Sequence, residues 1–194
     1  IKSTKAYSIY KPSLKKNILN LLKENLNSKT KYNHLLRIAL NKKILSISLR
    51  KRIQPNLNFD LKLVTLKRQK PEFKNLKYKE ILKHLSKLDN SRNDIGLCSN
   101  NKIFETGTSN LLFIKNDKVY SPINKFYKGI TYKFFKSKIK NIIKKDINVN
   151  SLKEFDEIIL IGSGKGVASV KTINQIKWKR KSLKFYNIFS RHYK

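Results

Sequence analysis

The sequence is poor in cysteine, methionine and acidic residues, and some of these shortages exclude whole classes of protein. The single cysteine, Cys98, cannot form a disulfide framework within the chain, so we expect a reducing compartment and a cytoplasmic protein. No apolar run approaches the roughly 20 residues of a membrane-spanning helix, and no signal-peptide pattern is present. The histidines, His34, His84 and His192, lack the spacing of metal ligands, so we expect no metal site.

Positive charge dominates the composition. Against 12 Asp+Glu there are 45 Lys+Arg, which gives a formal net charge of +33 and is typical of proteins that bind nucleic acid. The cations are nearly all lysine, however, whereas recognition of bases favours arginine. They are also spread from Lys2 to Lys194 between apolar residues, as on a solvated surface, and an AT-biased genome would produce the same excess of Lys, Asn and Ile. A basic RNA- or ribosome-associated protein stays an alternative, in which aromatic residues would stack on bases instead of forming a core stripe: Phe126, Tyr127, Tyr132, Phe134 and Phe135.

The first 66 residues predict a helix followed by antiparallel strands. Apolar residues at helical spacing predict a helix from about Ser13 to Asn27. Alternation of apolar and polar residues predicts three strands, with a hairpin turn at Asn41-Lys42 between the first two. The predicted strands are His34–Leu40, Lys43–Arg50 and Phe59–Leu66. We therefore expect residues 1–66 to form a partial N-terminal α+β domain.

The rest of the chain predicts a linker and a larger second domain. Residues 67–73 are polar and contain Pro71, as expected of an interdomain linker. Within residues 74–194, the predicted helices are Leu76–Leu88, Thr131–Lys145 and Lys181–His192, with a capping box at Ser151–Glu154. The predicted strands are Ile95–Cys98, Lys102–Phe104, Asn110–Lys115, Lys118–Ser121, Glu157–Ile161 and Val167–Ile173.

One carboxylate, Glu105, lies between a strand-like run and a short polar loop, and Asn110 then begins another apolar strand. The order E-T-G-T-S-N-L-L-F over residues 105–113 resembles the E-x-x-x-S-N-L/I-F signature of the class IV (fold-type IV) pyridoxal-phosphate enzymes. These include the D-amino-acid and branched-chain aminotransferases and 4-amino-4-deoxychorismate lyase. The resemblance implies that Glu105 pairs with the ring nitrogen of pyridoxal 5′-phosphate, and that Thr108, Ser109 and Asn110 line the ring. As residue types, the last three are also ordinary turn formers.

The resemblance also implies a lysine that binds the cofactor covalently, about thirty residues before Glu105. Lys74 stands at this place, ahead of a predicted helix, where relatives carry K-S-L-N or K-H-L-N-R. A lysine suits the task because desolvation lowers the pKa of its amine until the amine attacks the cofactor aldehyde. In a chain this rich in lysine, a solvated surface residue is the plain alternative. Lys77 is the second candidate.

Two glycine turns are candidates for binding the cofactor phosphate, which needs backbone N–H donors at a helix start. Gly129-Ile130-Thr131 precedes a predicted helix and resembles the family's G-I/V-T/M-R turn. The string G-S-G-K-G-V at 162–167 follows a predicted strand and resembles the family's N-S-x-R-G-V or G-T-x-x-x-V loop, which gives Ser163 and Gly164 as phosphate contacts. It is not a P-loop, because the P-loop spacing is not met and a strand follows instead of a helix. Simple loop geometry would also explain both turns.

These motifs fall in the family's order over roughly residues 32 to 194, where Leu152–Leu160 is also similar to L-x-x-A-D-E-V-F-L. The resemblance implies an α+β fold of two domains, a small N-terminal α/β sandwich and a larger C-terminal pseudo-barrel. It also implies a homodimer with a small amino substrate. The R-L-x-x-S segment that supplies a phosphate-binding arginine in relatives is not found, and we leave Arg37 and Arg50 unassigned. Because methionine is absent and the chain begins at Ile1, we expect a leading segment to be missing.

The motifs are closer to lyase and D-aminotransferase versions than to the branched-chain type, which usually carries E-G-S-G-E-N. The Lys165-Gly166 pair is similar to the R-G of lyase-like relatives. We therefore expect chemistry like that of 4-amino-4-deoxychorismate lyase, in which pyruvate is eliminated to give 4-aminobenzoate for the folate pathway, with Lys74 carrying the proton. A class IV aminotransferase would use the same lysine, ring and carboxylate, and it stays open. So does an interaction subunit that keeps the fold without the chemistry.

Overall fold

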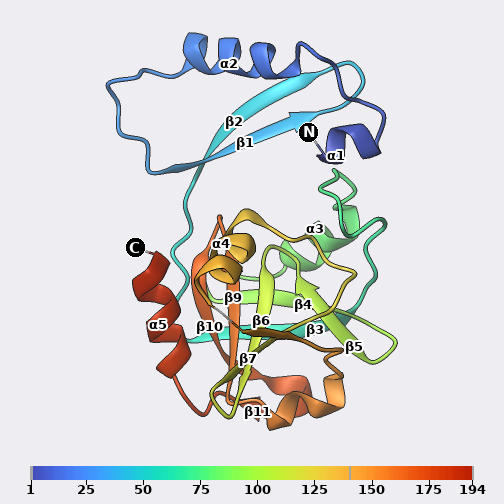
Figure 1. Ribbon diagram of the computed structural model, residues 1–194, viewed down its shortest axis with the longest axis vertical. Helices are drawn as coiled ribbons and strands as arrows, with labels where there is room; N and C mark the ends of the chain where they lie inside the picture. Colours follow the sequence, from blue (N-terminus) through green and yellow to red (C-terminus); the bar gives the residue numbers. More distant parts are fainter. Residues whose placement is uncertain (1, 140, 194) are drawn as a thin grey trace. The chain divides into compact units, whose positions relative to one another are not determined.

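The computed structural model describes residues 2–139 and 141–193, which fold as two compact units (Figure 1). Unit 1 comprises Ile1–Arg52 with Phe73–Leu76, and unit 2 comprises Ile53–Glu72 with Lys77–Lys194. The expectation about the start of the chain concerns Ile1, which lies outside the described residues. Each unit has its own secondary structure and is described by itself.

Unit 1 combines short helices with a β-hairpin. Its elements are α1 (Lys2–Ala6), α2 (Leu14–Asn25), β1 (His34–Leu40) and β2 (Leu45–Lys51). Asn41 forms the hairpin turn, because its Oδ1 accepts the N–H groups of Lys43 and Ile44 while its own N–H donates to the Ile44 carbonyl. The helix and the hairpin predicted for this region are confirmed, and α1 was not predicted.

Unit 2 is built on one nine-stranded sheet, in the order β5-β4-β3-β10-β9-β6-β7-β8, with β11 paired to β10 (Figure 1). The strands are β3 (Phe59–Thr65), β4 (Asn93–Ser99), β5 (Lys102–Thr106), β6 (Asn110–Lys115), β7 (Lys118–Ser121), β8 (Ile142–Lys144), β9 (Glu157–Gly162), β10 (Gly166–Ile173) and β11 (Trp178–Lys179). Sequence reasoning assigned Phe59–Leu66 to the N-terminal domain, whereas β3 pairs in parallel with β4 and β10 of unit 2. Alternation along a strand shows which face is buried and says nothing of its partner strand.

The sheet curls until its first strand meets the segment that follows its last strand. The N–H of Ile103 in β5 donates to the Ile147 carbonyl at 3.0 Å, and the N–H of Val149 donates to the Asn101 carbonyl at 2.9 Å. The outer edge of β5 is therefore paired, and the sheet is nearly closed. The predicted α+β class with a pseudo-barrel is confirmed.

The central strands of this sheet bury both faces. On β6, Leu111 and Phe113 lie in one apolar cluster, whereas Leu112 and Ile114 lie in a second, and β9 divides in the same way. Burial on both faces explains why these segments are continuously apolar instead of alternating.

Helices cover parts of this sheet. They are α3 (Lys79–Leu85), α4 (Ile130–Lys138) and α5 (Lys184–Tyr193), with the short 3-10 helices η1 (Val149–Glu154) and η2 (Asn174–Ile176). Phe135 of α4 packs edge-on against Phe189 of α5, with ring centroids 4.8 Å apart, in the second apolar cluster. Helix α3 packs on β4 instead, through Ile81 and Leu85.

Two predicted helices are longer than the observed ones. The helix predicted over Thr131–Lys145 ends at Lys138, and Ile142–Lys144 forms β8, paired in parallel with β7. Lys140 lies outside the described residues. The isoleucines of this segment fit a helical stripe, but β-branched residues also favour a strand when a partner is available. The helix predicted over Leu76–Leu88 is reduced to α3.

Candidate functional site

Glu105, on β5 of unit 2, is a buried carboxylate with only 4% of its surface exposed. Its Oε1 lies 3.1 Å from Nε of Arg68, and its Oε2 accepts the N–H of Tyr127 at 3.2 Å. Burial raises the pKa of the Glu105 carboxyl from 4.5 to about 7, while the positive charge of Arg68 and the Tyr127 N–H act against this rise. Glu105 therefore changes its charge near pH 7. Desolvation favours the protonated carboxyl, whereas Arg68 and the Tyr127 N–H favour the ionised form.

The loop that follows β5 is organised by the hydroxyl of Thr106. Thr106 Oγ1 accepts the N–H groups of Thr108 at 3.2 Å and Ser109 at 2.8 Å, and the Thr106 N–H donates to the Ser109 carbonyl. Gly107 has no room for a side chain, because an added Cβ would lie 3.0 Å from Ile95 Cγ1. The loop leaves Thr108 exposed and buries Ser109.

Asn110, the first residue of β6, connects this loop to the segment before α4. Its Nδ2 donates to the Tyr127 carbonyl at 2.6 Å, and its Oδ1 accepts the Gly129 N–H at 3.1 Å. Because the Tyr127 N–H donates to Glu105, the same short segment is held by both side chains. The structure thus brings together Glu105, Asn110 and Gly129, as sequence reasoning expected of neighbours in one site.

The N-terminus of α4 has the chemistry of an anion site. The first N–H groups of a helix have no acceptor within the helix, and the helix dipole favours negative charge at this end. Thr131, in the first turn of α4, is buried. Ile130, the first residue of the helix, is 79% exposed.

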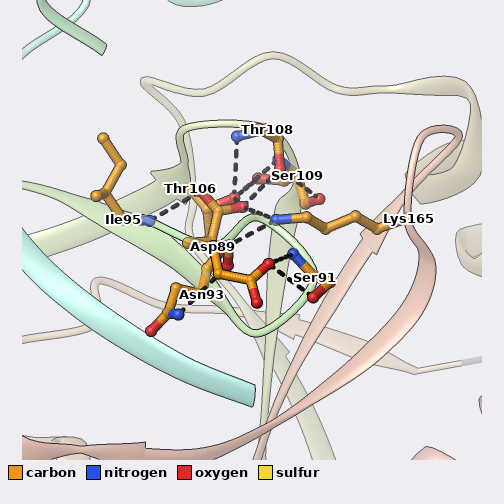
Figure 2. A network of polar contacts seen from close by, with 9 residues as sticks. Asp89, Ser91, Asn93, Ile95, Thr106, Thr108, Ser109 and Lys165 are labelled. Carbon is orange, nitrogen blue, oxygen red and sulfur yellow. Dashed lines mark hydrogen bonds and ion pairs between the residues drawn. The ribbon is translucent and has the colours of Figure 1, made fainter. Parts of the chain in front are cut away.

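The turn between β9 and β10 packs on the same loop. A Cβ on Gly162 would lie 3.0 Å from Ser109 Oγ, so the turn and the loop are in close contact. Ser163 is exposed and Gly164 half-buried, between the two strands. The side chain of Lys165 points toward the loop that contains Thr106 and Ser109 (Figure 2). Its Nζ lies 3.0 Å from Asp94 Oδ2. Because Gly166–Ile173 is a strand, the exclusion of a P-loop is confirmed.

Lys74 belongs to unit 1. Its backbone N–H donates to Ser3 Oγ at 3.0 Å, and Lys74 is exposed. The adjacent Asn75 donates from Nδ2 to Tyr7 Oη at 3.0 Å. Lys77 belongs to unit 2, where its Nζ donates to Gln69 at 2.8 Å. The approach of Lys74 to Glu105 stays a prediction.

Sequence reasoning missed two residues of this region. Arg68 was placed in the linker and Asp94 was given no role, but both make buried ion pairs in unit 2. One signal was available for Asp94, because it is one of only 12 acidic residues and directly precedes an apolar strand. For Arg68 the contact with Glu105 is tertiary, and nothing in the local pattern points to it.

The donors and acceptors of unit 2 fit pyridoxal phosphate. A protonated ring nitrogen requires a carboxylate, and Glu105 is a buried one whose pKa burial raises to about 7. A phosphate requires N–H and hydroxyl donors, and the first turn of α4 offers N–H groups that have no acceptor within the helix, with Thr131 beside them.

A family model for amino-transferase class IV matches residues 2–173. The chain belongs to this family. Its members are pyridoxal-phosphate-dependent enzymes, so the predicted family, the enzyme class and the cofactor that goes with it are confirmed. No curated protein matches the chain significantly.

Solved structures with the same fold include both lyases and aminotransferases. One is a 4-amino-4-deoxychorismate lyase from Pseudomonas aeruginosa (14% identity, TM-score 0.71, covering 95% of this chain and 78% of that one). A branched-chain aminotransferase from Thermoproteus uzoniensis, solved with norvaline, is similar over 99% of this chain and 74% of that one (14% identity, TM-score 0.75). An aminotransferase from Brucella abortus bound to pyridoxal phosphate covers 98% and 79% (15% identity, TM-score 0.70). At these identities the likeness shows the fold alone.

Within residues 2–139 and 141–193, none of the helices has the length and the apolar composition of a membrane span. Within the same ranges, no group of three or more His, Cys, Asp or Glu side chains could hold a metal ion.

Proposed function

We propose that this chain is a pyridoxal-phosphate-dependent lyase that eliminates pyruvate from 4-amino-4-deoxychorismate and releases 4-aminobenzoate. The observation that carries the proposal is the buried Glu105 carboxylate, joined through Tyr127 and Asn110 to the start of α4. Within one unit, this arrangement offers an acid for a ring nitrogen and N–H donors for a phosphate. Family membership and the fold shared with a 4-amino-4-deoxychorismate lyase support it.

In this proposal each residue of unit 2 has a stated task. Glu105 holds the ring nitrogen, and Arg68 holds Glu105 in its ionised form. The start of α4 and the β9–β10 turn would hold the phosphate, through Gly129, Ile130, Thr131, Ser163 and Gly164. The loop residues Thr108, Ser109 and Asn110 line the ring. When bound, the cofactor supplies an electron sink for the negative charge that develops on the substrate carbon next to the amino group.

Lys74 is the proposed catalytic residue. Its amine would hold the cofactor, and as a free base it would take the proton from the substrate carbon that bears the amino group. Loss of this proton and cleavage of the ether C–O bond leave an aromatic ring. The departing group takes up a proton and becomes pyruvate, so the reaction consumes no oxidant.

A class IV aminotransferase is the alternative within the family. The same lysine and carboxylate would serve it, and the fold shared with the branched-chain aminotransferase supports it. The E-T-G-T-S-N loop that begins at Glu105 favours the lyase, because the branched-chain type usually carries a different sequence there. A homodimer belongs to either version of the proposal.

The test is product formation by the purified chain supplied with pyridoxal phosphate and 4-amino-4-deoxychorismate. We expect 4-aminobenzoate and pyruvate in equal amounts without any added 2-oxo acid. Lys74→Ala should lower the rate by at least roughly 1000-fold, while the control Lys77→Ala keeps most of it. Turnover only in the presence of a 2-oxo acid would establish the aminotransferase instead, and no turnover under either condition would contradict both.

The non-enzymatic alternative is an RNA-associated protein, suggested by the net charge of +33. Of the aromatic residues that would stack on bases, Phe126, Tyr132 and Phe135 are at most 2% exposed and belong to the apolar cluster between α4, α5 and the sheet. Residues with this burial cannot stack on bases from solution. The structure therefore favours a core role for these three residues, whereas Phe134 is 37% exposed.

A further inference from the structure

We propose that the buried Asp94–Lys165 ion pair is a positioning device for the candidate site. In this proposal the pair fixes the loop Thr106–Asn110 and the turn Gly162–Gly166 relative to each other. The inference rests on the proposed function, because these two segments carry the residues proposed to hold the cofactor ring and phosphate. Asp94 and Lys165 themselves act through these segments and are assigned no contact with the cofactor.

Asp94 lies at the start of β4 and is completely buried. Its Oδ1 accepts the N–H of Ile95 at 2.8 Å. Its Oδ2 accepts the hydroxyls of Thr106 at 2.9 Å and Thr108 at 2.5 Å, and it also accepts Lys165 Nζ at 3.0 Å. One carboxylate oxygen thus organises the loop that follows Glu105 and receives a cation from a different strand connection.

Lys165 approaches from the β9–β10 turn, as Figure 2 shows. Its side chain is only 6% exposed, and its Nζ lies 4.7 Å above the Phe59 ring, within 3.4 Å of the Asn93 carbonyl. A lysine is rarely buried to this degree without a paired charge. Because Asp94 neutralises its ammonium, Lys165 is not available as the counter-charge of a phosphate, although it is the neighbour of Ser163 and Gly164 in sequence.

The two segments also touch directly. A Cβ on Gly162 would lie 3.0 Å from Ser109 Oγ, and a Cβ on Gly107 would lie 3.1 Å from Asp94 Oδ1. The ion pair is therefore accompanied by close packing that leaves no room for a side chain at Gly107 or Gly162. A shift of the turn would have to break either this packing or the pair.

A gain in folding stability does not by itself explain why a buried ion pair stands at this place. Replacing a buried ion pair by apolar residues of similar size is often neutral or stabilising, because desolvation of the two charges offsets their attraction. What an ion pair supplies and an apolar contact does not is a fixed direction, since Asp94 meets several donors at defined angles. Fixed geometry is what groups that bind a small anion require.

The test compares binding of two ligands that cannot react with lysines, 4-deoxypyridoxine 5′-phosphate and 4-deoxypyridoxine, which differ only in the phosphate. We expect Asp94→Asn and Lys165→Met each to weaken binding of the phosphorylated ligand by about tenfold. Binding of the ligand without phosphate should change much less. Lys165→Arg, which keeps the charge, should restore most of the lost affinity. The double variant Asp94→Asn/Lys165→Met, which leaves no unpaired buried charge, gives the answer if a single variant does not fold.

Lys115→Met is the matched control, because it breaks an ion pair with Glu154 that is partly open to solvent and lies at the end of β6 away from the loop. Equal loss of both ligands, or unchanged affinity for the phosphorylated one, would overturn the inference. If the unaltered chain binds neither ligand, the proposed function fails. The positioning role is then tested by hydrogen exchange of the unaltered chain and the variants without ligand. Positioning predicts that either substitution speeds exchange in both segments, whereas a change confined to the substituted segment would refute it.

Discussion

The residue on which the site depends most is Glu105, because its charge is balanced between two opposing effects. Burial raises the pKa of its carboxyl to about 7, and Arg68 at 3.1 Å limits the rise. A protonated ring nitrogen requires the ionised form. The Arg68 contact therefore decides how much of the protein is ready to bind a cofactor at neutral pH.

Titration of Glu105 should be visible in the pH dependence of stability. Since its folded pKa lies above 4.5, the folded state binds more protons than the unfolded state between about pH 4.5 and 7. The group's contribution to stability is thus full below pH 4.5 and is lost as pH rises through 7, by at most about 3 kcal/mol. Glu105→Gln should flatten this part of the stability curve, measured by urea unfolding. Parallel curves for the two proteins would contradict the assignment.

Arg68→Met is the partner experiment. Removing the cation should raise the pKa of Glu105 further, because Arg68 is the largest influence that lowers it. The pH midpoint for binding 4-deoxypyridoxine 5′-phosphate should then move upward. A midpoint that stays in place would show that Glu105 does not govern binding.

At the residue scale, the sequence identified candidate site residues where these lie within a few positions of one another. Glu105 and Asn110 stand a few residues apart, so one pattern identified both, and the structure connects them through Tyr127 and Gly129. Arg68 could not be predicted, because its partner lies 37 positions away in sequence and no periodicity connects the two (105 − 68 = 37).

At the scale of elements, the start of α4 is held in place from outside the helix. The helix has no side-chain cap at Gly129, and the Asn110 carboxamide accepts the Gly129 N–H instead. Asn110 also donates from Nδ2 to the Tyr127 carbonyl, and this bond fixes the segment that leads into the helix. The Asn110 side chain, together with Glu105, thus holds the segment that leads into the helix.

Asn110→Ala should therefore cost more than a typical carboxamide substitution. It leaves the Gly129 N–H and the Tyr127 carbonyl without their partner, which predicts a loss of about 1–3 kcal/mol in the free energy of unfolding by urea. Asn25→Ala is the control, because that side chain is exposed and bonds only within α2, and it should change stability by less than about 0.5 kcal/mol. Equal effects of the two substitutions would show that the α4 start is held by other contacts.

Elements were predicted well where the local pattern has one solution. Alternation and turn residues identified β1 and β2, and continuous apolar runs identified β6 and β9. The segment 131–145 failed because its isoleucines suit a helix and a strand, and pairing with β7 decides for a strand in Ile142–Lys144. Parallel pairing of β3 with β4 and β10 is a long-range property that period and turn signals do not contain.

At the scale of the whole molecule, the proposed chemistry uses residues of both units. Lys74 belongs to unit 1, and Glu105 with the start of α4 belongs to unit 2. Each unit has its own contacts, so either could fold correctly in a protein without activity. The proposed chemistry depends on a single lysine among many, in a chain with a net charge of +33.

The most direct test of this claim is to identify the lysine that binds the cofactor. The chain is loaded with one equivalent of pyridoxal phosphate, the bond between lysine and cofactor is reduced with borohydride, and the modified peptide is sequenced by mass spectrometry. We predict modification at Lys74, with loss of the label in Lys74→Ala and also when excess 4-deoxypyridoxine 5′-phosphate is present. Label at Lys77, or spread over exposed lysines and unaffected by the competitor, would contradict the account.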